Sequence, residues 1–312
     1  MTLLIQYTII YAVVLFLVAI GGCYSERSGV MNLGLEGIMV IGALGGALAM
    51  KFLSGAAPAV VIFGVIFASA LCGILYSLLL AIPAITLGAD QTLIGTAINM
   101  LATAFATVFV RSLNSGMNGT TEAKITYITE KDPLMFNVFG LQLNAFVIVA
   151  LVVLFAAVFI MKKTRFGFRL SACGENPHSA ASAGINVVKM RYTGVLISGA
   201  LAGLGGIAYI TSSVSEWSFD YGVAGYGFLA MAVMIFGKWK PASIAVGAVV
   251  FGFFRALSNI YSGFDWLVKL NIPGAVYNML PYLISLLILV IASERSHAPK
   301  AVGVPYNGNI AS

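Results

Sequence analysis

The sequence predicts an all-α membrane protein, a polytopic bundle of about nine transmembrane helices. Hydrophobic residues make up 60% of the 312 residues and charged residues only 9%, against about 25% charged in a typical soluble domain. The mean hydropathy is +0.98, and no water-soluble fold has an interior large enough for that much apolar surface. The apolar residues also fall into runs of about 20, which is the length that crosses a bilayer.

Nine such runs follow one another along the chain, and eight to ten spans fit the pattern. The first run has no basic segment before it and no small-residue cleavage pattern after it, so it predicts a retained helix. The second run is rich in glycine and the seventh is short, as in broken or re-entrant helices. The predicted spans are Leu3–Gly22, Gly29–Met50, Pro58–Ile82, Thr92–Arg111, Leu143–Met161, Tyr192–Ser212, Tyr221–Gly237, Ala242–Leu257 and Ala275–Ala292.

Basic residues orient the predicted bundle, because cytoplasmic loops carry an excess of lysine and arginine. The loop from Lys162 to Arg191 is the most basic of the chain, and placing it in the cytoplasm puts most lysines and arginines inside. The N-terminus is then outside and the C-terminus inside. We expect residues 1–293 to form one permease domain and residues 294–312 to form a disordered cytoplasmic tail. The polar segment Ser112–Gln142 fits either an ordered external cap or a flexible loop.

The basic loop contains its own helix signals. Asn176 is a good capping residue, Pro177 suits the first helical position, and Gly184 suits the end of a helix. A helix from Pro177 to Ala183, built from small residues, has little apolar surface of its own to bury. We interpret it as a docking element for another protein; an ordinary connection between two spans is the alternative.

Polar residues inside predicted spans are candidates for a translocation pathway. Asn32 and Glu36 are four residues apart and would share one helix face. The pathway candidates in and beside the fourth span are Gln91, Thr96, Asn99 and Thr103, and the last three belong to a polar stripe that suits a hydroxyl-bearing solute. Alternatively, Glu36 pairs with an internal arginine or is solvated at the interface, and the polar stripe makes hydrogen bonds between helices.

Aromatic and acidic residues gather near the start of the seventh run, among them Trp217, Asp220, Tyr221 and Tyr226. Tryptophan and tyrosine are typical of the aromatic belt at lipid headgroups, and we favour that interpretation. An external mouth that receives an aromatic base is the alternative.

Several function classes lack their motifs in this sequence. It contains no GxxxxGK[ST] loop, since Gly237-Lys238 is followed by Trp239, and no HExxH or GxSxG motif. Cys23, Cys72 and Cys173 show no metal-ligand spacing. The net charge is +6, but the basic residues lie in short segments beside apolar spans. They therefore predict orientation in a membrane and not nucleic-acid binding. We therefore predict no catalytic residues, no metal and no cofactor, and any ATPase would be a separate subunit.

Two motifs and a glycine-rich run carry a resemblance to a known family. The segments SERSGVMNLGLEG and TRFGFRLSACGENPHSAASAGINV, followed by SGALAGLGG, resemble the inner-membrane permeases of bacterial ABC importers. That group takes up branched-chain amino acids, ribose-type sugars and nucleosides, and this chain looks most like its nucleoside and simple-sugar branch. The resemblance runs from about Leu3 to Ala292.

The resemblance implies a function and a set of partners. In the family the GENP…AGIN loop docks into the ATPase, and by motif that role falls to Gly174, Glu175, Asn176, Pro177, Ala180, Ala181, Gly184, Ile185 and Asn186. The expected partners are ABC ATPase subunits, a second permease subunit that is identical or homologous, an extracytoplasmic substrate-binding lipoprotein and membrane lipids. We expect a permease of the bacterial cytoplasmic membrane that moves nucleosides by alternating access. A sugar or branched-chain amino-acid permease is the nearest alternative, and an ion-coupled secondary transporter is an alternative of another class.

Overall fold

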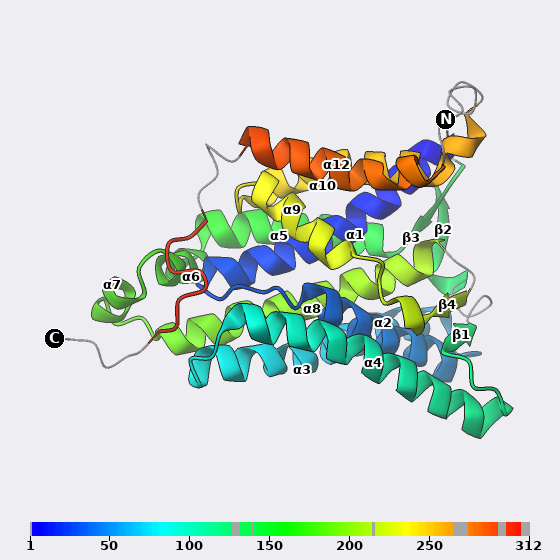
Figure 1. Ribbon diagram of the computed structural model, residues 1–312, viewed down its shortest axis with the longest axis horizontal. Coiled ribbons are helices and arrows are strands. Elements are labelled where there is room, and N and C mark those ends of the chain that lie inside the picture. Colours follow the sequence, from blue (N-terminus) through cyan, green and yellow to red (C-terminus); the bar gives the residue numbers. More distant parts are fainter. Residues whose placement is uncertain are drawn as a thin grey trace.

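The computed structural model describes residues 2–126, 132–138, 140–213, 216–264, 274–292 and 298–306. Helices dominate these residues, and they run side by side along one long axis (Figure 1). The long helices are α1 (Thr2–Arg27), α2 (Leu35–Phe52), α3 (Pro58–Ala81), α4 (Gln91–Asn118), α5 (Phe146–Lys163), α8 (Val187–Ser213), α10 (Pro241–Ile260) and α12 (Gly274–Ala292).

The shorter elements lie at the two ends of the bundle or interrupt it. Helices α6 (Arg165–Glu175) and α7 (Pro177–Ser182) lie at one end, and the strands lie at the other (Figure 1). The strands form two antiparallel pairs, β1 (Lys124–Thr126) with β4 (Glu216–Ser218) and β2 (Met135–Val138) with β3 (Leu141–Asn144). The remaining elements are the π-helix η1 (Ile82–Thr86), the 3₁₀ turns η2 (Asp132–Leu134), η3 (Phe219–Tyr221) and η4 (Tyr261–Gly263), and the helix α9 (Tyr226–Phe236).

Within the described residues, seven helices are long and apolar enough to cross a membrane. They correspond to seven of the nine predicted spans. The predicted seventh span contains only α9, an apolar helix of 11 residues. Gly222, Ala224 and Gly225 all have positive φ angles, a conformation that a helix does not allow, so α9 begins only at Tyr226. The predicted ninth span coincides with α12, and the number of spans in the whole chain stays a prediction.

The second predicted span also begins later than expected. Helix α1 continues past Gly22 to Arg27, and Gly29 has a φ of 93°, so residues 28–34 form an extended turn before α2. Asn32 therefore lies outside the helix that contains Glu36, and the prediction that the two share a helix face is wrong.

The core of the bundle is built on α1 and α8, which lie side by side; α1 also contacts α10, and α8 also contacts α2 and α3. Glycine allows the closest of these approaches. A Cβ atom on Gly42 of α2 would lie 2.2 Å from the Cα atom of Gly203 on α8. By contrast, α3 presents bulky apolar side chains outward, with Phe63 and Phe67 73% and 68% exposed, as expected of a helix that faces lipid.

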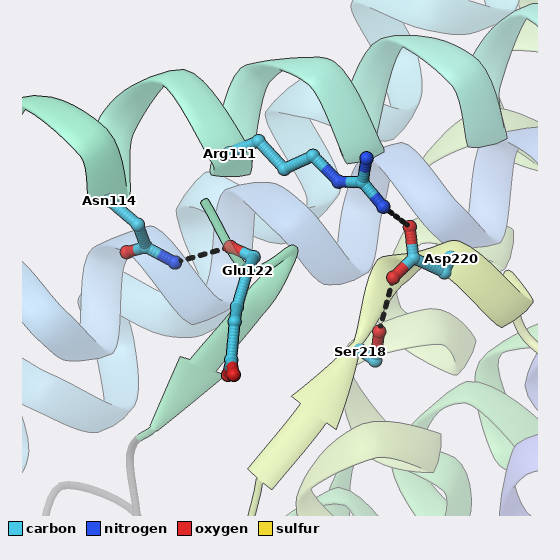
Figure 2. A network of polar contacts seen from close by, with 5 residues as sticks. All are labelled: Arg111, Asn114, Glu122, Ser218 and Asp220. Atoms are coloured by element: carbon cyan, nitrogen blue, oxygen red, sulfur yellow. Dashed lines mark hydrogen bonds and ion pairs between the residues drawn. The ribbon is translucent and has the colours of Figure 1, made fainter. Parts of the chain in front are cut away.

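Polar contacts fasten the strand end of the bundle to α4 (Figure 2). Arg111 forms an ion pair of 3.0 Å with Asp220, which also accepts a hydrogen bond from the Ser218 hydroxyl. The Asn114 side chain donates to the carbonyl oxygens of Glu122 and Lys124, at 2.8 and 2.7 Å. The described part of Ser112–Gln142 is thus an ordered cap, joined to β4 through the β1–β4 pair.

Candidate functional site

The predicted docking helix is present as α7. The Asn176 side chain accepts a hydrogen bond of 3.0 Å from the Ser179 N–H, and Pro177 occupies the first turn, where no N–H is needed. Gly184, with a φ of 79°, reverses the chain beyond the helix, and its N–H donates to the Ala181 carbonyl at 2.9 Å. The local predictions for the cap, the first turn and the terminating glycine are confirmed.

The docking motif divides into an exposed and a buried set of residues. Glu175, Asn176, Gly184 and Asn186 are exposed, and the Asn186 side chain accepts from the Lys189 N–H at 2.9 Å, which caps α8. Gly174, Pro177 and Ala180 are buried, and Ala181 and Ile185 are half-buried. The exposed side of α7 is therefore small and polar, while its inner side anchors the helix to the rest of the molecule.

Helix α6, which the sequence analysis did not predict, connects the loop to the bundle. The Thr164 side chain caps it by accepting from the Gly167 N–H at 3.2 Å. A Cβ atom on Gly174 would lie 2.4 Å from the Arg27 carbonyl oxygen, so the end of α6 rests directly on the end of α1. The loop and the first helix of the bundle are therefore in direct contact. Capping residues before a polar helix with a basic first turn, here Thr164 and Arg165, were the signal that could have revealed it.

Residues 298–306, which belong to the tail expected to be disordered, lie against this loop (Figure 1, red). The Ala301 N–H donates to the Gly174 carbonyl at 2.8 Å, and the fully buried Arg191 donates to the Val304 carbonyl at 3.0 Å. The Tyr306 ring lies 5.3 Å from the His178 ring and packs against the buried cluster that contains Cys173 and Ala180. Residues 298–306 thus pack against the buried side of α7 and support it.

Three of the pathway candidates hold the turn before α2 in place. Gln91 accepts from the Met31 N–H at 2.7 Å, and Asn99 both accepts from the Gly37 N–H at 2.7 Å and donates to the Leu33 carbonyl at 2.8 Å. Asn32 is buried, donates to the Ser198 hydroxyl at 2.9 Å and accepts from the Gly34 N–H. These amides satisfy backbone groups that no helix satisfies, as buried polar groups must.

Glu36 binds the start of α9. Its two carboxylate oxygens accept hydrogen bonds from the Gly225 and Gly227 N–H groups, at 2.8 and 2.6 Å. The positive end of a helix and its unpaired N–H groups stabilise a carboxylate in this position. The internal partner of Glu36 is therefore a helix terminus and not an arginine.

The remaining candidates lie on α4. Thr96 is exposed on the side of the subunit and donates to the Thr92 and Leu93 carbonyls of its own helix. Thr103 is half-buried and donates to the Asn99 carbonyl at 3.4 Å. The structure thus brings Gln91, Asn99, Asn32 and Glu36 to the turns that precede α2 and α9, and leaves Thr96 apart from them.

A cavity of about 290 Å³ lies near the strand end, and Trp217, one of the residues of the alternative external aromatic mouth, lines it. It is lined by Tyr7 and Tyr11 of α1, Tyr209 of α8, Trp217 of β4, and Arg255 and Asn259 of α10. Its signals in the sequence are Trp217, from the aromatic and acidic group before the seventh run, and Arg255, a charged residue within an apolar run. The lining comes from four separate segments, so no local motif reveals the cavity.

Comparison with known proteins places the whole chain in one family. Residues 4–292 match the model of the permease component of branched-chain amino acid transport systems. The chain belongs to this permease family. It is 39% identical to the guanosine ABC transporter permease protein NupQ of Bacillus subtilis, over 98% of this chain and 97% of that protein. It is 33% identical to the nucleoside ABC transporter permease protein NupC of Lactococcus lactis, over 97% and 96%.

A more distant relative carries another substrate in its name. The permease is 29% identical to the putative glucose ABC transporter permease protein TsgC13 of Haloferax volcanii, over 97% of each chain. No solved structure matches the permease. The chain is thus a multi-pass permease subunit of an ABC transporter in the cell membrane, and it is not itself an enzyme.

Proposed function

We propose that this permease carries nucleosides into the cell as part of an ATP-driven importer, and that α7 is the element on which the ATPase subunit docks. The observation that carries the proposal is the construction of α7. Its ends are capped, its inner side is anchored by Ala180 and Pro177, and its outer side is small and polar. A rigid helix of this kind passes on a push from a partner, whereas a free loop would absorb it.

In this proposal α6, α7 and the tail face the cytoplasm and the strands face the outside. Exposed basic residues surround α7, among them Lys162, Lys163, Arg169 and Lys189, as expected of a cytoplasmic loop. The N-terminus is then outside, and an extracytoplasmic binding protein delivers the solute to the strand end. A second permease subunit, identical or homologous, completes the membrane part of the importer.

The contacts around α7 supply a route for coupling. Closure of the ATPase subunits displaces α7, and the contact of Gly174 with Arg27 transmits the displacement to α1. Because α1 and α8 form the core of the bundle, a shift of α1 changes how the helices pack around the solute. ATP then alters the balance between outward and inward access by binding one state more tightly than the other.

The nucleoside assignment rests on the relatives. Two full-length relatives at 39% and 33% identity are named for guanosine and for nucleosides, while the relative named for glucose is 29% identical. An ion-coupled mechanism would need an acidic group that binds and releases a proton or sodium ion. Glu36 is the acidic residue among the pathway candidates, and both of its carboxylate oxygens already accept hydrogen bonds from N–H groups before and within α9.

The test is uptake of labelled guanosine, cytidine, ribose and leucine by cells that contain the complete transporter, with and without this permease. We expect nucleoside uptake that requires the permease and is abolished when the ATPase is disabled. Uptake of ribose or leucine alone would contradict the substrate assignment. Uptake that persists with a disabled ATPase and disappears with an uncoupler would contradict the energy source.

A proline at Gly184 tests the docking role. Proline fixes φ near −65° and has no N–H, so it fits neither the φ of 79° nor the bond to Ala181, at a cost of about 3 kcal/mol. Gly184→Pro should reach the membrane but lose uptake and the stimulation of ATPase activity by the substrate-loaded binding protein. Gly55→Pro is the matched control, since Gly55 has a φ of 84° in an exposed turn that no neighbouring atom approaches. Normal uptake by Gly184→Pro would overturn the docking assignment.

A further inference from the structure

The aromatic side chains around the 290 Å³ cavity are in ring contact with one another. Tyr7 stacks on Tyr11 at 6.1 Å, and Tyr209 meets Trp217 edge-on at 5.3 Å. Tyr226, buried behind them, lies 4.2 Å from Tyr209 and 5.9 Å from Tyr11. The rings fix one another, so the cavity has rigid aromatic walls. Aromatic walls bind flat, conjugated ligands by stacking, at about 1–3 kcal/mol for a nucleobase.

The polar groups of the cavity are mainly hydrogen-bond donors. The Arg255 Nε–H donates a hydrogen bond of 2.8 Å to the Tyr226 hydroxyl, and a guanidinium has four further N–H donors. The Trp217 indole N–H is buried and has no hydrogen-bond partner among the described residues. The Asn259 amide donates to the Tyr11 hydroxyl, which orders the exposed side of the cavity. A ligand that presents acceptor atoms would satisfy these donors.

Arg255 has no described carboxylate within ion-pair distance; the ion pairs in the described parts of the chain are Arg111–Asp220 and Glu122–Lys124. An arginine within an apolar helix is costly unless a partner or a ligand accepts its donors. The Arg255 guanidinium also lies 5.1 Å from the Tyr226 ring centre, which holds its plane in place. A fixed guanidinium that borders a cavity can make two parallel hydrogen bonds to one ligand edge.

We propose that this cavity binds the base of a 6-oxopurine nucleoside, with the base stacked on the tyrosine rings and its O6 and N7 acceptors facing Arg255. Arginine pairs with these two acceptors of guanine in the same bidentate manner in DNA recognition. Adenine presents an amino donor in place of O6, so it would face Arg255 with a donor opposite a donor. Cytosine and uracil offer a smaller surface for stacking.

The structure around Trp217 supports a site and not a chance gap. Trp217 sits on β4, whose partner β1 is held to α4 by Asn114, and the adjoining η3 is held by the Arg111–Asp220 ion pair (Figure 2). The cavity also lies at the end of the bundle opposite α7. In the proposed orientation that end faces the binding protein, so the cavity would receive the solute first. The inference therefore rests on the proposed function.

The experiment measures uptake of guanosine, 7-deazaguanosine and adenosine by the complete transporter, with the binding protein unchanged throughout. 7-Deazaguanosine lacks the N7 acceptor, and Arg255→Lys keeps the charge but loses the bidentate edge. We expect Arg255→Lys to reduce guanosine uptake about tenfold and adenosine uptake much less. The loss of uptake caused by Arg255→Lys and the loss caused by 7-deazaguanosine should not be additive, because both changes remove the same hydrogen bond. Equal losses for guanosine and adenosine, or additive losses, would overturn the assignment.

Trp217→Phe provides a second readout, because it keeps an aromatic ring but removes the indole N–H together with part of the ring surface. It should weaken guanosine uptake and abolish any quenching of protein fluorescence by added guanosine. Tyr221→Phe is the control, since Tyr221 is exposed at the same end of the bundle and lies outside the cavity. Unchanged guanosine uptake by Trp217→Phe would contradict the proposal. Failure of the wild-type transporter to take up any nucleoside would instead contradict the proposed function, so the two failures are distinct.

Discussion

The side chain of Asn176 shows how much of the docking loop depends on one residue. Asn176 lies between α6 and α7. Its backbone N–H donates a hydrogen bond to the Ala172 carbonyl of α6, and its side-chain oxygen accepts one from the Ser179 N–H of α7. Helix α7 has six residues, too few to be stable without a cap. The hydrogen bond of this cap at the surface is therefore one of the contacts that fix the shape that the ATPase is proposed to bind.

Replacement of Asn176 tests that dependence. Asn176→Ala should cost about 1 kcal/mol of helix stability and reduce uptake and ATPase stimulation, while the protein stays in the membrane. Asn176→Asp retains the acceptor and should restore both activities. Ser182→Ala is the control, because the Ser182 hydroxyl is exposed and donates only to His178 of its own helix. Equal uptake by Asn176→Ala and Ser182→Ala would show that the cap has no role in coupling.

At the scale of elements, glycine controls how closely the helices pack. In the run Ser198–Gly206 of α8, Gly199 and Gly203 meet α3, and Gly203 also meets Gly42 of α2. Small residues four apart, here Gly42 with Gly46 and Gly199 with Gly203, are typical of close helix packing, and Gly42 and Gly203 meet across α2 and α8. The partner helices were not predictable, because the spacing marks a contact face without saying which helix meets it.

Gly42→Ala tests how much the contact between Gly42 and Gly203 contributes to the stability of the bundle. Its Cβ atom would lie 2.2 Å from the Gly203 Cα atom, so α2 and α8 must move apart, at a cost of about 1–3 kcal/mol. The melting temperature of the purified permease in detergent should fall. Gly116→Ala is the matched control, since that position on α4 has no neighbouring atom within 4 Å and should be neutral or slightly stabilising. A similar melting temperature for the two variants would contradict the packing described here.

Sequence reasoning predicted the elements better than their borders. Runs of apolar residues predicted the long helices because hydrocarbon length is a local property, and Asn176, Pro177 and Gly184 predicted α7 because caps are local too. The late start of α2 and the shortness of α9 depend on positive φ angles at Gly29 and Ala224, which tertiary contacts impose. The aromatic cavity around Arg255 depends on four segments distant in sequence, and no local pattern predicts it.

On the scale of the whole molecule, the segment 298–306 joins the end of the chain to its middle. It contacts Gly174 on α6, Arg191 on α8 and, through Tyr306, His178 on α7. Pro305 also comes near Gly88, in the turn before α4. A segment that contacts four separate parts of the same end makes them move as one body.

The buried thiol of Cys173 reports whether this segment is in place. Burial raises the pKa of Cys173, while the charge of Arg191 opposes the shift, so less thiolate is present at neutral pH than for an exposed thiol. In a variant with Cys23→Ser and Cys72→Ser, maleimide should label Cys173 slowly and faster as the pH rises. Deletion of residues 298–312, or Tyr306→Ala, should speed labelling at neutral pH and weaken coupling; Lys300→Ala is the control. Unchanged labelling after the deletion would show that the segment does not shield α6.

The position of residues 298–306 also has a consequence for biosynthesis. A chain is made from its N-terminus, so α7 is made long before the residues that support it. A product released shortly after α12 would have its full set of helices and an unsupported docking helix. An ATPase that recognises only the supported form would leave such products unassembled.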